Sequence, residues 1–296
     1  MKQWLLSSLL LLGAVATGYA QFTYSSIDFP GGDLTTAFGI NNHGDIVGSY
    51  RITPPRHALL VSDGNFIPLA PGSILATHFS EAWKSNNRGD VVGEFVGDDG
   101  FTHGFLFSDG ALTTLDFPGA SDTLALGINE SGTVVGFWDI VDAFGNTIVD
   151  HGFTWKDGQF SQIDFPGAAD SAVFGINARG DLVGGWDSGI TSPFEHGFVI
   201  SKHGATSFDV PGATITQADD INASGDIVGT YINAAGDQHG FLLSGTTLST
   251  IDFPGAAGSS AWGINSAGQI VGNYRLVPAG VAHGFIAQPE EKQKPH

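Results

Sequence analysis

Short runs of apolar residues alternate with polar residues over most of the chain, and clusters of Gly, Asn, Asp and Pro separate the runs. A period of two is typical of half-buried β-strands, and the Ile, Val, Phe and Thr content of the runs favours strands as well. One representative stretch predicts four strands, at Thr123–Asn129, Thr133–Trp138, His151–Trp155 and Gln159–Phe165. Asp157 and Gly158, between the last two strands, are a strong signal for a tight hairpin.

The same pattern recurs six times at spacings of 41 to 48 residues. Each copy approximates Gly-Ile-Asn-x-x-Gly-Asp-Ile-Val-Gly, a variable loop, His-Gly-Phe, Asp-Gly and finally Ile-Asp-Phe-Pro-Gly-Ala. The markers are Asn41, Asn86, Asn129, Asn177, Asn222 and Asn265, then His57, His103, His151, His196, His239 and His283, then Pro30, Pro71, Pro118, Pro166, Pro211 and Pro254. Periods of this length are typical of propellers and solenoids, and four antiparallel strands in about 45 residues form one blade. We therefore predict an all-β, six-bladed β-propeller of four-stranded antiparallel blades.

The two ends of the repeat region indicate a closed ring. Phe22–Phe29 matches only the fourth strand of a repeat, and His283–Ala287 matches only the third. Together they complete one blade, so we expect the N-terminal strand to pair with the C-terminal blade. Such closure removes the exposed sheet edges on which other chains could pair.

The repeat resembles a known family. His-Gly-Phe followed by Asp-Gly, with Gly-Ile-Asn and Val-Gly between copies, is similar to the HAF repeat of extracellular bacterial proteins. The resemblance covers roughly residues 22–287, but only His57-Ala58-Leu59 keeps the alanine of the name-giving triplet. It implies secretion and a repeat fold, and it implies no activity.

The first twenty residues have the layout of a secretory signal peptide. Lys2 supplies the positive end, Leu5–Val15 the apolar middle and Gly18–Ala20 the small residues of a cleavage site. We therefore expect a signal peptide at 1–20, the propeller at 21–288 and a polar, disordered tail at 289–296. The protein is expected to be secreted, extracellular or periplasmic.

The amino-acid composition limits the classes of partner that this protein is expected to bind. The chain has 30 acidic and 11 basic residues, a net charge of −19, and no cysteine, so disulfides and cysteine-held zinc are excluded. An acidic surface repels phosphate backbones and anionic lipids, which argues against nucleic acid and membrane partners. We expect a monomer whose partner is an extracellular glycan or protein.

Two sets of repeated residues have structural explanations, because a residue present in most blades serves what every blade needs. Aspartates end the fourth strand and are expected to accept hydrogen bonds from turn amides or from the repeat histidine. They are Asp28, Asp116, Asp164, Asp209 and Asp252. Aromatic residues end the second strand and favour packing between blades. They are Tyr50, Phe95, Trp138, Trp186, Tyr231 and Tyr274.

The second-strand aromatics also have a functional interpretation. They precede the variable loops, where rigid scaffolds often carry their binding residues. Trp138 and Trp186 lie in consecutive repeats, beside Asp139 and Asp187. A flat ring next to a carboxylate suits a hydroxyl-rich ligand, so we include these four residues in the predicted binding site.

Departures from the repeat point to the propeller axis. A glycine of the first strand becomes Lys84 in the second repeat and Asp220 in the fifth. Those two blades lie opposite each other in a six-fold ring. The preceding, otherwise apolar position is Trp83 in the second repeat and Asp219 in the fifth, and an acid there has a desolvation cost unless it faces the channel or finds a partner. We predict that Trp83, Lys84, Asp219 and Asp220 bind a ligand in the channel.

These features favour a non-catalytic binding or scaffold propeller. The alternative is a propeller glycosidase or polysaccharide lyase that uses Asp219, Asp220 and Glu81, since glycosidases need a pair of carboxylates at about 5–9 Å. Neighbouring residues of a strand point to opposite faces, which weakens Asp219 and Asp220 as that pair. We expect no cofactor, although Gly97–Gly100 and Asp139–Asp150 offer oxygen ligands that calcium could use.

Overall fold

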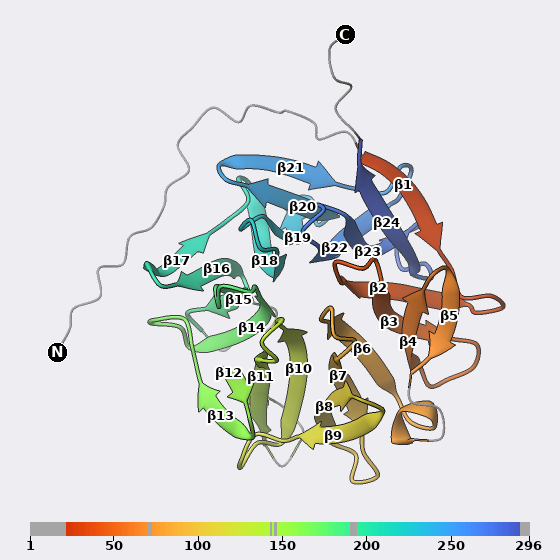
Figure 1. The fold of residues 1–296 in the computed structure, drawn as a ribbon. Helices are drawn as coiled ribbons and strands as arrows, with labels where there is room; N and C mark the ends of the chain where they lie inside the picture. The colour runs from red at the N-terminus through yellow and green to blue at the C-terminus, as the bar shows by residue number, and fades with distance from the viewer. Residues whose placement is uncertain (1–21, 70–72, 143, 145–146, 190–193, 291–296) are drawn as a thin grey trace.

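The computed structural model describes residues 22–69, 73–142, 144, 147–189 and 194–290. The expected signal peptide and most of the expected tail lie outside these residues. Six four-stranded antiparallel sheets surround a central axis (Figure 1), so the predicted six-bladed propeller is confirmed. We number the blades 1 to 6 along the chain.

Blades 1 to 3 each use four consecutive strands, ordered from the axis outward. Blade 1 contains β2 (Leu34–Ile40), β3 (Ile46–Arg51), β4 (His57–Ser62) and β5 (Asn65–Pro68). The short helix η1 (Ile74–Ala76) leads to blade 2, which contains β6 (Ser80–Ser85), β7 (Val91–Val96), β8 (Thr102–Ser108) and β9 (Ala111–Leu115). Blade 3 contains β10 (Asp122–Ile128), β11 (Val134–Val141), β12 (Thr147–Lys156) and β13 (Gln159–Gln162).

Blades 4 and 5 repeat this order, and blade 6 combines both ends of the described chain. Blade 4 contains β14 (Asp170–Ile176), β15 (Leu182–Asp187), β16 (His196–Ser201) and β17 (Gly204–Phe208). Blade 5 contains β18 (Ala213–Ile221), β19 (Ile227–Asn233), β20 (Gln238–Ser244) and β21 (Thr247–Ile251). Blade 6 contains β22 (Gly258–Ile264), β23 (Ile270–Arg275), β24 (His283–Pro289) and β1 (Phe22–Ile27). Among the described residues, no helix is long and apolar enough to cross a lipid bilayer.

The strands of blade 3 depart from the predicted bounds at their outer ends. β13 ends at Gln162 rather than Phe165, because Asp164 leaves the ladder and accepts hydrogen bonds from His151 and the Gly152 amide. The Asp-Gly hairpin is as predicted. Asp157 and Gly158 have φ of 49° and 84°, which a tight turn between twisted strands requires.

The repeated His-Gly-Phe builds the blade interiors. Its phenylalanines are fully buried in five blades, and Leu59 takes that place in blade 1. The phenylalanines are Phe105, Phe153, Phe198, Phe241 and Phe285. The Val-Gly motif makes room for this ring, since a Cβ on Gly136 would lie 1.8 Å from the Leu124 carbonyl oxygen and 3.0 Å from the Phe153 ring.

The ring closes as predicted from the sequence. β1 pairs antiparallel with β24, from Phe22 opposite Pro289 to Ile27 opposite Gly284, and the two strands lie side by side in Figure 1. β24 extends to Pro289, so the predicted boundary of the propeller at 288 is one residue short of the strand end. This pairing covers the outer edge of β24, as expected for a closed propeller.

The asparagines of the first hairpin in each blade also link the blades into a ring through hydrogen bonds. Each Nδ2 donates to the carbonyl oxygen of the corresponding asparagine in the next blade. The six bonds run Asn41 to Asn86, Asn86 to Asn129, Asn129 to Asn177, Asn177 to Asn222, Asn222 to Asn265 and Asn265 back to Asn41, at 3.1 to 3.4 Å. Each Oδ1 also accepts two amides of its own turn, as Asn41 does from His43 and Asp45 at 2.9 Å. The face that carries these asparagine turns is called the turn face, and the opposite one, with the Pro-Gly turns and variable loops, the loop face.

Candidate functional site

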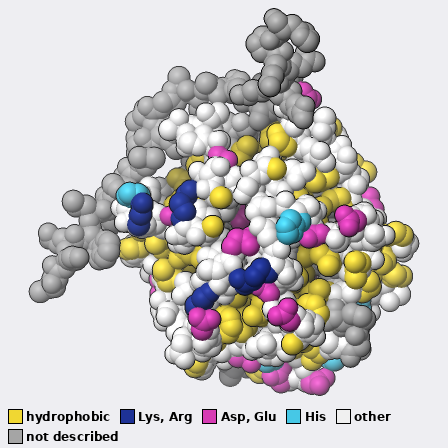
Figure 2. Space-filling view, viewed as in Figure 1, with side chains coloured by type: hydrophobic (Ala, Val, Ile, Leu, Met, Phe, Trp, Pro, Cys, Tyr) yellow, Lys and Arg dark blue, Asp and Glu magenta, His cyan; other side chains and the backbone are white. Residues whose placement is uncertain are grey.

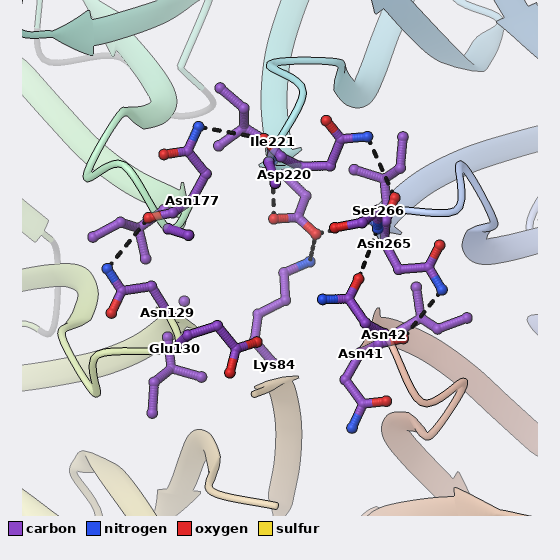
Figure 3. Close-up of a pocket in the computed structure, with 18 of the residues that line it drawn as sticks. Asn41, Asn42, Lys84, Asn129, Glu130, Asn177, Asp220, Ile221, Asn265 and Ser266 are labelled. Carbon is purple, nitrogen blue, oxygen red and sulfur yellow. Dashed lines mark hydrogen bonds and ion pairs between the residues drawn. The ribbon is translucent and has the colours of Figure 1, made fainter. Parts of the chain in front are cut away.

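The channel along the propeller axis is closed near the turn face by an ion pair. Lys84 of β6 reaches across to Asp220 of β18, in the opposite blade, with 3.3 Å between Nζ and Oδ2 (Figure 3). Lys84 also donates to the carbonyl oxygens of Phe38, at 2.9 Å, and Trp262. Asp220 Oδ2 accepts the Ile264 amide at 3.0 Å. The two departures from the repeat therefore meet, and each is held by further hydrogen bonds.

Two cavities occupy the loop-face half of the channel. The inner chamber has a volume of about 240 Å³, and its walls include Trp83, Leu126, Phe174, Gln217, Asp219 and Trp262. The mouth cavity, of about 430 Å³, lies beside it, and its walls include Phe38, Arg51, Arg56, Glu81, Arg275 and the same two tryptophans. Trp83 and Trp262 border both cavities, with ring centroids 5.9 Å apart and planes at 75°. These two rings therefore separate an apolar space from a polar one.

Asp219 lies in the wall of the inner chamber, at a position that is aromatic or Leu in the other blades. It is buried, and its Oδ2 accepts a hydrogen bond of 3.0 Å from the Thr230 hydroxyl. Burial raises the pKa of Asp219 well above its usual value, against the opposing effects of Thr230 and Lys84. Burial therefore favours the protonated acid over the carboxylate, and a protonated acid can donate a hydrogen bond.

Aromatic side chains from several blades complete the inner chamber. Phe194, from the loop before β16, packs edge-on against Phe137 of β11 and Phe174 of β14, at 6.3 and 5.9 Å between ring centroids. The sequence analysis did not include these three phenylalanines. Phe174 occupies the same repeat position as Asp219, which is a sequence signal for the channel. Phe194 lies in a variable loop, and a loop sequence does not say where its side chain will lie.

Arginines gather at the mouth cavity, which the sequence analysis also missed. Arg51 binds Asp33 through Nε and Nη2 at 2.9 and 3.2 Å. Arg56 Nη1 lies 2.9 Å from Glu81 Oε1. The exposed Arg275 guanidinium has no hydrogen-bond or ion-pair partner among the described residues. Two of the three arginines are thus paired with carboxylates, and Arg275 gives the mouth one unpaired positive charge in a strongly acidic chain.

Two glutamates face each other in blade 2 beside the mouth cavity. Glu81 of β6 and Glu94 of β7 are directly opposite in the ladder, and both are buried. Burial raises the pKa of Glu81, and the ion pair with Arg56 opposes that shift. Burial, reinforced by the charge of Glu81, raises the pKa of Glu94 to about 8. Glu94 Oε2 has no hydrogen-bond partner in the described part of the chain, so Glu94 is a buried acid that stays protonated at neutral pH.

Trp138 and Trp186 lie outside the channel cavities and pack between blades. Trp138 stacks on Phe117, which follows the last strand of blade 2, with centroids 4.5 Å apart. Trp186 stacks in the same way on Phe165, at 4.7 Å, and its Nε1 donates to Ser207 Oγ at 2.8 Å. Trp138 is only 9% exposed. The structure thus shows both rings in the packing role, and the predicted stacking on a ligand does not fit this placement.

The predicted carboxylates Asp139 and Asp187 are buried beneath the same loops. Asp139 Oδ1 accepts the Asp122 amide at 3.1 Å, and Asp187 Oδ1 accepts the Gly189 amide at 3.1 Å. Burial, followed by the charge of Asp122, raises the pKa of Asp139 to about 6. Each of these side chains therefore stabilises the local backbone through an amide hydrogen bond.

The repeat histidines and aspartates contact each other, which confirms the structural explanation. Their Nδ1 to carboxylate distances are 2.7 to 3.1 Å in five blades. In blade 1 the aspartate is replaced by Leu69, and His57 Nδ1 lies 3.3 Å from the Leu75 carbonyl oxygen instead. These pairs are spread around the rim, so they do not form one site.

The geometry weighs against the glycosidase alternative. Asp219 faces the inner chamber, Asp220 binds Lys84, and Glu81 faces the mouth cavity. The two tryptophans stand between Asp219 and Glu81, so these carboxylates do not face one bond of a substrate. In the described ranges, no three His, Asp or Glu side chains are arranged to hold a metal ion, and part of the Asp139–Asp150 candidate lies outside those ranges.

Charge is distributed unevenly over the surface. In the view of Figure 2, basic side chains form small groups among acidic ones, and apolar side chains are interspersed. Four large apolar side chains are exposed in the loops of blades 1 and 6 near the mouth cavity. They are Ile52, Leu276, Val277 and Val281, at 47 to 59% exposed.

No protein-family model and no curated protein matches this chain. Solved structures with a similar arrangement of blades include the β-propeller domain of the Trilobed protease from Pyrococcus furiosus, at 10% identity and a TM-score of 0.49, covering 88% of this chain and 100% of that one. Aleuria aurantia lectin, a six-bladed propeller that recognises fucose, is 10% identical with a TM-score of 0.46, covering 84% and 90%. Trypanosoma rangeli sialidase in complex with sialic acid is 10% identical with a TM-score of 0.48, covering 93% and 58%. These similarities concern the blade arrangement alone.

Proposed function

We propose that this protein is exported and acts as an extracellular binding propeller, whose mouth cavity recognises an acidic glycan without catalysis. Export follows from the layout of residues 1–20 and agrees with the resemblance to the HAF repeat. The site follows from the structure of the mouth cavity, whose volume of about 430 Å³ lies within the range of small-ligand sites.

The observation that carries the proposal is the group of arginines at the mouth. Three of the 11 basic residues border this cavity, although the chain has 30 acidic residues. Arg275 is exposed and is free to bind a carboxylate, since it has no partner among the described residues. Guanidinium groups bind carboxylates through paired, charge-assisted hydrogen bonds. A uronic acid or another acidic sugar would supply that carboxylate.

The wall of the cavity supports a sugar ring. Phe38 stacks on Trp83 with centroids 4.1 Å apart, and Trp262 meets Phe38 edge-on at 5.9 Å. Aromatic faces of this kind pack against the C–H surfaces of sugars. Asn273, also in the wall, accepts the Trp262 indole N–H through Oδ1 and offers its Nδ2 to sugar hydroxyls.

A protein partner is the second candidate. Ile52, Leu276, Val277 and Val281 surround the same mouth with exposed aliphatic surface. Aliphatic side chains next to arginines suit a protein surface with apolar and acidic residues. The two candidates use the same face of the propeller and differ in which wall residues contribute binding energy.

A glycan array tests the proposal. The secreted protein should bind oligosaccharides that contain uronic acids more strongly than their neutral counterparts. Arg275→Ala should weaken that binding by about tenfold or more, because a charge-assisted pair is lost. Lys202→Ala, an exposed basic residue of the β16–β17 hairpin, is the matched control and should bind like the wild type. The proposal is contradicted if acidic and neutral oligosaccharides bind with equal affinity, or if Arg275→Ala binds the acidic ones as tightly as the wild type.

A further inference from the structure

The inner chamber is a second, distinct binding space. Its volume of about 240 Å³ exceeds the ~150 Å³ of a cavity that accommodates benzene. By simple proportion, it has room for a flat molecule of about ten non-hydrogen atoms, such as two fused rings. Leu126, Phe137, Phe174 and Phe194 supply an apolar wall, which favours an apolar ligand body.

The chamber exists because blade 5 breaks the repeat. At the position of Asp219, the other blades carry Phe38, Trp83, Leu126, Phe174 and Trp262. An aromatic side chain in blade 5 would extend into the space that Asp219 leaves open. An acid also has a desolvation cost there, which an apolar residue would avoid. The presence of Asp219 instead of an apolar side chain therefore reduces packing in blade 5. It leaves an open space with a polar group at its edge.

Polar groups lie together on one strand of the chamber. Gln217 and Asp219, two residues apart on β18, both line it. The Gln217 amide has no hydrogen-bond partner in the described ranges, and the Asp219 carboxyl interacts with the hydroxyl and the backbone amide of Thr230. Burial favours the neutral form of Asp219, as shown above. Lys84 also lines the chamber, but its Nζ is already bound to Asp220 and to the carbonyl oxygens of Phe38 and Trp262. The polar groups left for a ligand are thus a neutral acid and an amide, which match a hydroxyl or carbonyl rather than an ion.

We propose that the inner chamber binds a small, neutral aromatic molecule of about two fused rings, with its hydroxyl or carbonyl group against Asp219 and Gln217. The ring body packs among the phenylalanines, between the Lys84–Asp220 ion pair and the loop face. This site does not depend on the acidic glycan proposed for the mouth cavity, because it uses different polar groups and excludes charge.

The test uses 2-naphthol as a neutral probe and naphthalene-2-sulfonate as a charged one, with binding measured by calorimetry. Wild-type protein should bind 2-naphthol saturably at one site and bind the sulfonate at least about tenfold more weakly, because burying an unpaired charge is costly. Asp219→Phe fills the chamber with the side chain of other blades. It should abolish 2-naphthol binding while the melting temperature stays the same or rises.

Two further variants keep the outcome decisive. Asp219→Asn preserves shape and hydrogen bonding, and should retain 2-naphthol binding within about threefold even if Asp219→Phe does not fold. Arg275→Ala, which tests the glycan site, should leave 2-naphthol binding unchanged. The proposal is overturned if the wild type shows no saturable binding, if a well-folded Asp219→Phe binds as before, or if a crystal soaked with 2-naphthol holds it elsewhere.

Discussion

At the scale of single residues, burial raises the pKa of some carboxylic acids and so favours their neutral form. Glu94 is one such acid, and it lies directly opposite Glu81 in the ladder of blade 2. Glu81 forms an ion pair with Arg56, which opposes the rise that burial causes in its pKa. Like charges so close cannot both be stable in a buried place, so the proton stays on the glutamate that lacks an ion-pair partner.

Replacing Glu94 should therefore make stability less dependent on pH. The pKa of Glu94 is about 8 in the folded protein and 4.5 in its ordinary state. Between these values the folded state binds more protons than the unfolded state, so the free energy of unfolding falls as pH rises. Glu94→Gln cannot lose a proton. It should match the wild type near pH 4 and be more stable by at least ~1 kcal/mol near pH 8, measured by chemical denaturation.

Glu290→Gln serves as the control, since Glu290 is exposed at the end of β24. Its stability relative to the wild type should stay level across the same pH range. If the difference in free energy of unfolding between Glu94→Gln and the wild type also stays constant with pH, the pKa of Glu94 is not raised in the folded protein. That result would refute its protonated state.

At the scale of strands and turns, the hairpin asparagines do two jobs. Asn129 Oδ1 accepts the amides of Ser131 and Thr133 at 3.1 and 3.0 Å, which shapes the turn. Its Nδ2 donates to the Asn177 carbonyl oxygen of the next blade at 3.2 Å. A local turn signal in the sequence is thus also a bond between blades.

Asn129→Asp separates the turn-forming role of the side chain from its hydrogen bond to the next blade. The carboxylate still accepts both turn amides, but it cannot donate, and it faces the carbonyl oxygen of Asn177. We expect the free energy of unfolding to fall by about 2 kcal/mol, because a buried acceptor loses its partner. Chemical denaturation measures this loss.

Asn233 offers a matched control. It forms the same kind of turn, accepting the Ala235 and Asp237 amides at 2.9 and 3.0 Å, but within an exposed loop of blade 5. Its Nδ2 donates to Asp237 Oδ2 at 3.2 Å within the same exposed loop, so Asn233→Asp breaks no bond between blades and solvent screens the added charge beside Asp237. The loss of stability should therefore be smaller. Equal losses in the two variants would show that the bond between blades contributes nothing measurable.

At the scale of the whole molecule, stability depends on closing the ring. β1 completes blade 6 through six residue pairs with β24. Tyr24 of β1 also packs against Phe253 and Phe285, at 6.0 and 5.9 Å between ring centroids. The first strand therefore holds the ends of the propeller together through both backbone and core contacts.

Deleting residues 22–29 should leave β24 as an open edge. We expect a large drop in melting temperature, together with association through the exposed edge. Thermal unfolding and size-exclusion chromatography measure the two effects. Ser25→Ala, at an exposed position of the same strand, should behave like the wild type. A truncated protein that melts like the full one would mean that β1 is dispensable for the ring.

The sequence by itself determined the blade count, the strand order and the place of ring closure. These features rest on local signals repeated at a nearly constant spacing, such as the Asp157–Gly158 turn and the buried Phe153 of His-Gly-Phe. Hairpins form between neighbours in the chain, so a short stretch contains the information they need. It also indicated that Lys84 and Asp220 lie on opposite blades, because a six-fold ring with known order has known opposites.

Only the tertiary structure decided what the departures from the repeat create. Phe194 reaches the channel from a loop, and no periodic pattern predicts that contact. The two cavities depend on the combined volumes of side chains from several blades. The mouth arginines Arg51 and Arg275 end strands of different blades, and Arg56 lies in a loop, so only the closed ring brings them together. Contacts between residues far apart in the sequence depend on how the blades are arranged in the ring. For that reason the cavities and their lining residues could be identified only from the tertiary structure.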